Sequence, residues 1–90
     1  MSTPFRDMRT VIALASLSSG EALRVVNLPD DKELAIHLRV LGLREGESVV
    51  LLRRAPLGGP LHLRTESGIE IALGRPAASL IFGERRESPP

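Results

Sequence analysis

Only one segment of the chain, residues 31–41, repeats its apolar side chains at the spacing of an α-helix, and this feature constrains the fold most. The apolar stripe consists of Leu34, Leu38 and Leu41. Asp30 can cap the start of the segment, and Glu33 three residues later completes a pattern typical of a capping box. Gly42 stands where a left-handed residue ends a helix, so that Leu43 can fold back onto the stripe as in a Schellman motif. The sequence therefore predicts one well-capped helix over residues 31–41.

The remaining apolar residues fall in short runs separated by turns, which is typical of strands. Residues 61–73 alternate apolar and polar side chains on both sides of a Ser-Gly pair, which predicts a β-hairpin. A short helical or irregular turn is predicted at 75–78. Further strands are predicted at 11–14, 23–28, 49–52 and 80–82. Roughly five or six short strands with one or two short helices define a mainly β, α+β fold, and we expect a small barrel because closure removes exposed sheet edges.

A chain of 90 residues provides for one small domain. Residues 1–10 mix charges with a proline and show no periodicity, which predicts a flexible N-terminus. Residues 84–90 are charged and end in Pro-Pro, which predicts a disordered tail. The folded domain is therefore expected to span residues 11–83.

Composition argues against several classes of function. The chain has no Cys, which excludes disulfide scaffolds, thiolate metal sites and cysteine nucleophiles. Its 12 basic and 11 acidic residues nearly cancel, and its only aromatic residues are two phenylalanines, so nucleic-acid binding is not expected. A small barrel that binds single-stranded RNA remains a minor alternative. There is no Gly-rich phosphate loop, and neither His has Ser and Asp neighbours at catalytic spacing, so an enzyme is not expected.

The chain offers little that would cross or enter a membrane. Its longest uncharged stretch, Thr10 to Gly20, has 11 residues, against the roughly 20 that a spanning helix needs. Two arginines before the apolar run 11–15 weakly resemble a secretory signal, but Asp7 interrupts them and the core needs that run. The sequence predicts no membrane span and a cytoplasmic location.

Two blocks of sequence carry a family resemblance. Residues 38–46 read LRVLGLREG, and after a predicted strand residues 53–60 read RRAPLGGP. This pair of blocks, at this separation, resembles the ferrous iron transport protein A (FeoA) family. The turn around Gly20 and the strand ending at Leu73 match the family as well, so the resemblance covers roughly residues 11–83.

The resemblance has two departures near its end. Gly74 stands where the family commonly has Arg, and Ala77 stands where it commonly has Glu, while Ala78 matches. The charges of the usual Arg and Glu therefore cannot be carried over to this chain.

The resemblance implies a small Src-homology-3-like (SH3-like) β-barrel with a helical insertion. It also implies a cytoplasmic accessory protein of ferrous iron uptake, whose partner is FeoB, a membrane permease with a GTP-binding domain. The family is not one of enzymes. A stand-alone regulatory module related to the C-terminal barrel of metal-dependent repressors is the alternative, although residues 1–10 are too few for the DNA-reading helices of such repressors. A weak homo-oligomer remains open.

The loop of the second block is the predicted partner-binding site. Two prolines restrict its backbone and two glycines permit positive φ, so the loop is expected to protrude as a shaped connection. Leu57 at the tip would anchor a partner, with arginines as donors. The alternative is that Leu57 folds back to cap the barrel. The predicted partner-binding residues are Arg53, Arg54, Ala55, Pro56, Leu57, Gly58, Gly59 and Pro60.

Metal binding has few candidate ligands. Glu33 and His37 stand four residues apart on one face of the predicted helix and could supply two ligands. His62 is expected to point to solvent from the hairpin. Because a stable ferrous site needs more ligands than these, we expect no cofactor, or at most weak binding of Fe²⁺ or another divalent metal.

Overall fold

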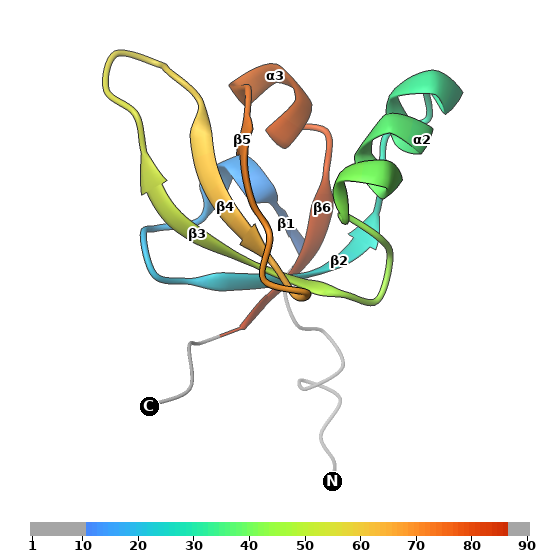
Figure 1. Ribbon diagram of the computed structural model, residues 1–90, viewed down its shortest axis with the longest axis horizontal. Helices are drawn as coiled ribbons and strands as arrows, with labels where there is room; N and C mark the ends of the chain where they lie inside the picture. The colour runs from blue at the N-terminus through green and yellow to red at the C-terminus, as the bar shows by residue number, and fades with distance from the viewer. Residues whose placement is uncertain (1–10, 87–90) are drawn as a thin grey trace, which may run out of the picture.

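The computed structural model describes residues 11–86, and these residues form one antiparallel sheet with short helices (Figure 1). The strand order is β1-β6-β2-β3-β4-β5, so β1 and β5 are the outermost strands. The helical elements are the 3₁₀ turn η1 (Leu14–Ser16), α2 (Lys32–Leu41) and α3 (Arg75–Ala78). The strands are β1 (Val11–Ala13), β2 (Ala22–Asn27), β3 (Ser48–Arg54), β4 (Leu61–Thr65), β5 (Glu70–Leu73) and β6 (Phe82–Arg86). The mainly β class with one or two short helices is thus confirmed.

The predicted helix forms, but its cap is one residue later than expected. The Asp31 carboxylate accepts hydrogen bonds from the backbone N–H groups of Glu33 at 3.0 Å and Leu34 at 3.2 Å. The predicted capping by Asp30 is therefore wrong. Asp31, one residue nearer to the first turn of the helix, accepts from both of these N–H groups instead. The predicted stop is confirmed: Gly42 has φ 104°, and the Leu43 N–H donates to the Leu38 carbonyl at 2.9 Å.

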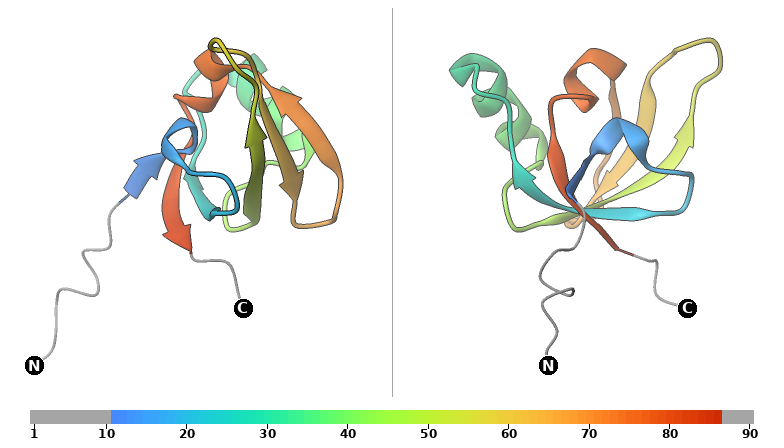
Figure 2. Two further views of the ribbon diagram at one scale, coloured as in Figure 1. Left: turned by 90° about the vertical axis from the view of Figure 1, so that its left-hand side faces the viewer. Right: turned by 180° about the vertical axis from the view of Figure 1, so that it is seen from behind.

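The core lies where the curved sheet, η1, α2 and α3 meet (Figure 2). Leu38 attaches α2 to it and is fully buried, whereas Val40 two residues later is exposed. The largest fully buried side chains are Leu14, Leu17, Leu23, Leu38, Leu43, Leu51, Leu61, Leu63, Ile81, Val25 and Val49. An aliphatic core therefore joins the helical elements to strands β1 to β5.

The last strand is displaced from its predicted position. The prediction for 80–82 is wrong, because Leu80 and Ile81 close the turn after α3 and β6 begins only at Phe82. Arg85 and Arg86 pair with Leu23 and Ala22 of β2, so residues 84–86 belong to the sheet and not to a disordered tail. Such pairing with a distant strand has no signature in local composition. The predictions for residues 1–10 and 87–90 lie outside the described residues.

Gly83 explains why β6 can cross so close to β2. A Cβ atom at this position would lie 2.1 Å from the Arg24 carbonyl oxygen, a distance that no side chain tolerates. Only glycine lets the two backbones approach here.

The helix α2 and the β3–β4 loop stand on opposite sides of the molecule, with α3 between them (Figures 1 and 2). We call these the helix side and the loop side. The helix side comprises α2, the turn 42–47 and the β4–β5 turn 66–69. The loop side comprises the segments 14–20, 52–62 and 74–82, which hold η1, the β3–β4 loop with the adjoining strand ends, and α3 with its flanking residues. Within residues 11–86, no helix has the length and apolar character needed to cross a membrane.

Candidate functional site

The β3–β4 loop, Ala55–Pro60, is a tight and specific turn. The Ala55 N–H donates to the Pro60 carbonyl at 3.0 Å, and the Gly59 N–H donates to the Pro56 carbonyl at 3.1 Å. The two residues between Pro56 and Gly59, Leu57 and Gly58, have φ of 59° and 76°. Two consecutive positive φ values are the mark of a type I′ turn, which strongly prefers Asn-Gly. Of the two glycines expected to permit positive φ, Gly58 adopts it and Gly59 does not, and the positive φ of Leu57 was not expected.

Leu57 occupies the tip of this turn and is fully exposed, at 102% of its reference area. The alternative in which Leu57 folds back to cap the barrel is therefore wrong. A leucine held at positive φ costs about 1 kcal/mol, and burial within the chain recovers none of that cost. Among residues 11–86, Leu57 is the one non-glycine residue with positive φ.

Gly59 keeps the loop narrow. A Cβ atom at Gly59 would lie 2.8 Å from the Cβ of Ala55, which is closer than two side chains can approach. The two arms of the loop therefore touch directly at its base.

Arg54 fixes the base of the loop to the beginning of the domain. It is half-buried, and its Nη2 donates to the backbone carbonyls of Ala15 and Leu17, each at 2.5 Å. Arg53, its neighbour, is exposed. The two arginines thus leave β3 for different surroundings. Arg54, however, donates to the chain itself, and only Arg53 presents its guanidinium freely to solvent.

Arg75 is a further residue of the loop side, and sequence reasoning missed it. It is half-buried at the start of α3, and its Nε donates to the Gly59 carbonyl at 3.0 Å. It follows Gly74, the position where the family commonly has Arg. The only sequence signal was therefore that Arg75 lies next to a position where an arginine was expected. Its hydrogen-bond partner, Gly59, is 16 residues away in the sequence.

The loop side carries three arginines, and the adjoining carboxylate of Glu21 pairs with Arg85 and not with any of them. The segments 14–20, 52–62 and 74–82 contain three arginines and no acidic residue. In the described part of the chain, none of these arginines forms an ion pair with a carboxylate. The arginines are Arg53, Arg54 and Arg75.

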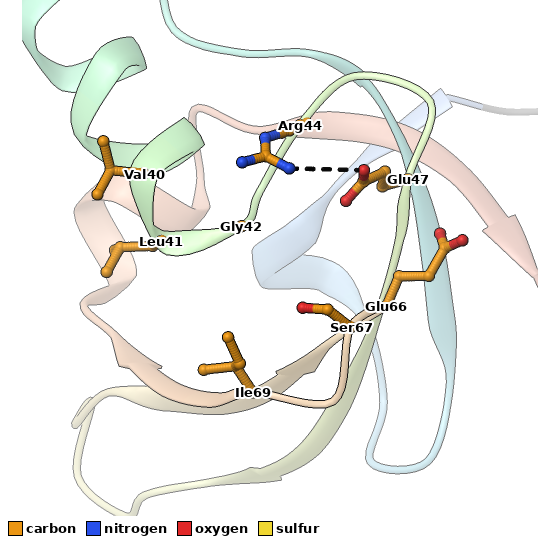
Figure 3. Close-up of a pocket in the computed structure, with 8 residues that line it drawn as sticks. All are labelled: Val40, Leu41, Gly42, Arg44, Glu47, Glu66, Ser67 and Ile69. Atoms are coloured by element: carbon orange, nitrogen blue, oxygen red, sulfur yellow. Dashed lines mark ion pairs between the residues drawn. The ribbon is translucent and has the colours of Figure 1, made fainter.

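The helix side has a pocket of about 330 Å³ that the sequence did not indicate (Figure 3). Val40 and Leu41 at the end of α2 lie across from Ile69, the last residue of the β4–β5 turn. The polar lining includes Arg44 and Glu47, which form an ion pair at 3.8 Å. Val40, an apolar residue off the stripe of α2, could have served as a sequence signal, whereas the alternation of the hairpin groups Ile69 with core residues.

A second ion pair joins the last turn of α2 to the turn that follows it. The Arg39 guanidinium donates to both Glu45 carboxylate oxygens, at 3.0 and 3.4 Å. These hydrogen bonds, together with one from backbone, hold the pKa of Glu45 below its ordinary value of 4.5. Both side chains are about half exposed, so this pair lies at the surface.

The candidate metal ligands are not brought together into a larger set. Glu33 and His37 are exposed on α2, and His62 is half-buried on β4. Within residues 11–86, no three His, Asp or Glu side chains gather where they could hold a metal ion. The structure adds no ligand to the candidates named from the sequence.

These features define the class of the protein: a small SH3-like β-module that presents a rigid, apolar-tipped loop. The chain belongs to the FeoA domain family, whose model matches residues 12–85. None of the curated proteins matches it by sequence.

Solved structures share the fold at low sequence identity. The crystal structure of an iron uptake regulatory protein (FeoA) matches with a TM-score of 0.78 at 23% identity, covering 86% of this chain and 100% of its own. The zinc complex of FeoA from Stenotrophomonas maltophilia, described as a prokaryotic SH3 domain protein, has a TM-score of 0.72 at 21% identity and covers 87% and 99%. A manganese-dependent transcriptional repressor reaches 0.77 at 19% identity, covering 88% of this chain and 44% of the repressor.

Proposed function

We propose that this chain is a small cytoplasmic accessory protein of ferrous iron uptake that docks on the GTP-dependent permease FeoB through its β3–β4 loop and modulates transport. Membership of the FeoA domain family supports a role in ferrous iron transport. The similar protein from Stenotrophomonas maltophilia has been suggested as a ferrous iron transport activating factor. The proposal assigns no catalytic step to the chain.

The single observation that carries docking is the fully exposed Leu57 on a loop whose base is fixed. An exposed apolar side chain on a flexible loop would lose most of its binding energy to ordering. Here hydrogen bonds from Arg54, Arg75 and Ala55 hold the loop before any partner arrives. A preorganised anchor of this kind is what a binding surface needs at its centre.

The experiment is anaerobic titration calorimetry of the chain against the soluble GTP-binding domain of FeoB from the same organism, with and without Fe²⁺. We expect saturable one-site binding without Fe²⁺. Binding that requires Fe²⁺ would assign a metal role to Glu33, His37 or His62. Absence of heat in both conditions would contradict docking on this domain and would direct the same titration to full-length FeoB.

Cells provide the second arm of this test. The double variant Leu57→Asp with Arg53→Glu should lower iron uptake while leaving the domain folded. Arg53 is preferred to Arg54 for this change because Arg54 holds η1. Undiminished uptake with a folded variant would contradict the assignment of the loop.

A stand-alone regulatory module is the second candidate function, and the likeness to repressor domains favours it. The chain corresponds to 44% of the repressor in the comparison. In this alternative the partner is a separate DNA-binding protein. Loss of the chain would then change transcription of iron-responsive genes while the activity of FeoB in isolated membranes stays the same.

A further inference from the structure

The tip of the loop breaks a local rule of turn chemistry that the neighbouring residues obey. Gly58 fits its positive φ, and Gly59 fits the close contact with Ala55, but Leu57 stands at the position that favours Asn. A single substitution to Asn would create the preferred Asn-Gly pair. Strained residues of this kind gather at binding sites, where the surroundings hold them in place. The strain thus points to a requirement for an apolar side chain at this position.

The formal charges also distinguish the loop side from the rest of the molecule. Among residues 11–86, the loop-side segments contribute a formal charge of +3 from Arg53, Arg54 and Arg75. The rest of these residues contribute seven basic and nine acidic side chains, a formal −2. Of these three arginines Arg53 is the exposed one, and none of the three pairs with a carboxylate of residues 11–86. Charge of one sign around a binding surface selects partners of the opposite sign.

We infer that Leu57 enters an apolar cleft rimmed by carboxylates on a protein partner, and that Arg53 faces this acidic rim. This inference rests on the proposed function, in which the partner is FeoB. It adds to that proposal the chemistry expected of the docking site on FeoB: an apolar cleft with carboxylates at its rim.

A protein cleft fits these observations better than an anionic lipid surface. Leu57 is the only large apolar side chain in the loop Ala55–Pro60, and one buried leucine contributes only about 1.5–3 kcal/mol. Stable membrane attachment requires more apolar area or a larger basic cluster. Two of the three arginines are also directed at backbone carbonyls. A rigid single anchor instead suits a pocket of matching shape.

The test measures the affinity of the full chain for full-length FeoB in nanodiscs, as a function of salt. Leu57→Asn should weaken binding at least about tenfold, as for a central anchor, while its melting temperature equals or exceeds that of the wild type. Leu57→Gly, which also relieves the strain, serves as a second variant. Arg53→Glu should weaken binding and remove most of its salt dependence.

Matched controls come from elsewhere on the molecule. Val40→Ala shortens an exposed apolar side chain on the helix side, and Arg86→Glu reverses an exposed arginine in β6; both should bind within about twofold of the wild type. If the wild type binds FeoB and both Leu57 variants bind equally well, the cleft is wrong while the proposed function stands. If the wild type does not bind FeoB, the proposed function fails and the cleft with it. Equal binding to empty nanodiscs of the same anionic lipids would replace the cleft with a lipid surface.

Discussion

The two sides of the molecule use arginine in opposite ways. On the helix side, Arg39 and Arg44 pair with carboxylates at the surface, where ion pairs contribute little. On the loop side, Arg54 and Arg75 are half-buried and donate to backbone carbonyls of distant segments. A hydrogen bond from a charged donor to a partly buried carbonyl contributes more, and it fixes the path of the backbone.

This difference indicates that the loop-side arginines fix the path of a loop, whereas the helix-side arginines form pairs at the surface. The helix side satisfies local rules: α2 is capped at both ends, and Arg39 and Arg44 each pair with a carboxylate. The loop side keeps a leucine at positive φ, which lowers stability, and an exposed arginine without an ion pair. Such features persist where a binding surface requires them.

The largest effect is expected on the helix side, from Leu38→Ala. Leu38 is fully buried and attaches α2 to the core. The variant should lose about 2–5 kcal/mol of unfolding free energy through lost burial and the cavity left behind, measured by urea denaturation. The loop should keep its conformation in any molecules that stay folded. Val40→Ala, two residues along the same helix, is the control and should change stability by less than about 0.5 kcal/mol.

The next effect distinguishes the two uses of arginine directly. Arg54→Ala should lower the unfolding free energy by about 1.5–3 kcal/mol, because the carbonyls of Ala15 and Leu17 lose a charged donor. Arg39→Ala on the helix side should cost less than about 1 kcal/mol. Denaturation of both variants under the same conditions provides the measurement. Equal losses would contradict the contrast between the two sides.

How far sequence reasoning reached also differs between the two sides. The helix could be predicted because its determinants are local: the Leu38 stripe, the glycine stop and an acidic cap all lie within a dozen residues. Even the wrong prediction of the N-cap was off by only one residue, Asp30 in place of Asp31. The hairpin 61–73 was predicted for the same reason, since its alternation is visible along the chain.

The position of the loop could be predicted from the sequence, but the hydrogen bonds that hold it could not. Its glycines and prolines marked a shaped connection, yet the arginine side chains that fix its base reach residues 16 to 39 positions away. Nothing near Arg54 indicates that its donors reach Ala15, and nothing near Arg75 points to Gly59. The start and end of β6 were missed for a similar reason, because a strand of charged residues is recognised only through its partner β2.

A smaller effect should appear at Arg75, and it should be confined to the loop. Arg75→Ala removes the hydrogen bond to the Gly59 carbonyl and should lower stability by about 1 kcal/mol. Amide hydrogen exchange at Ala55 and Gly59 should accelerate, because their turn is no longer held from α3. Arg64→Ala, which removes an exposed pair with Glu70, is the matched control. Unchanged exchange in the Arg75 variant would contradict a positioning role for this residue.

The smallest effect is a pH dependence on the helix side, from Glu45. The Arg39 hydrogen bonds hold the pKa of Glu45 below its ordinary value of 4.5 in the folded chain. The contribution of the pair is therefore fully present above the unfolded pKa and is lost as the pH falls through the lower, folded pKa. Because the pair is exposed, the loss should amount to only a few tenths of a kcal/mol. Unfolding of the wild type and Glu45→Gln should differ at pH 7 and converge in acid. A difference that persists or grows below the folded pKa would show that Glu45 acts through something other than its charge.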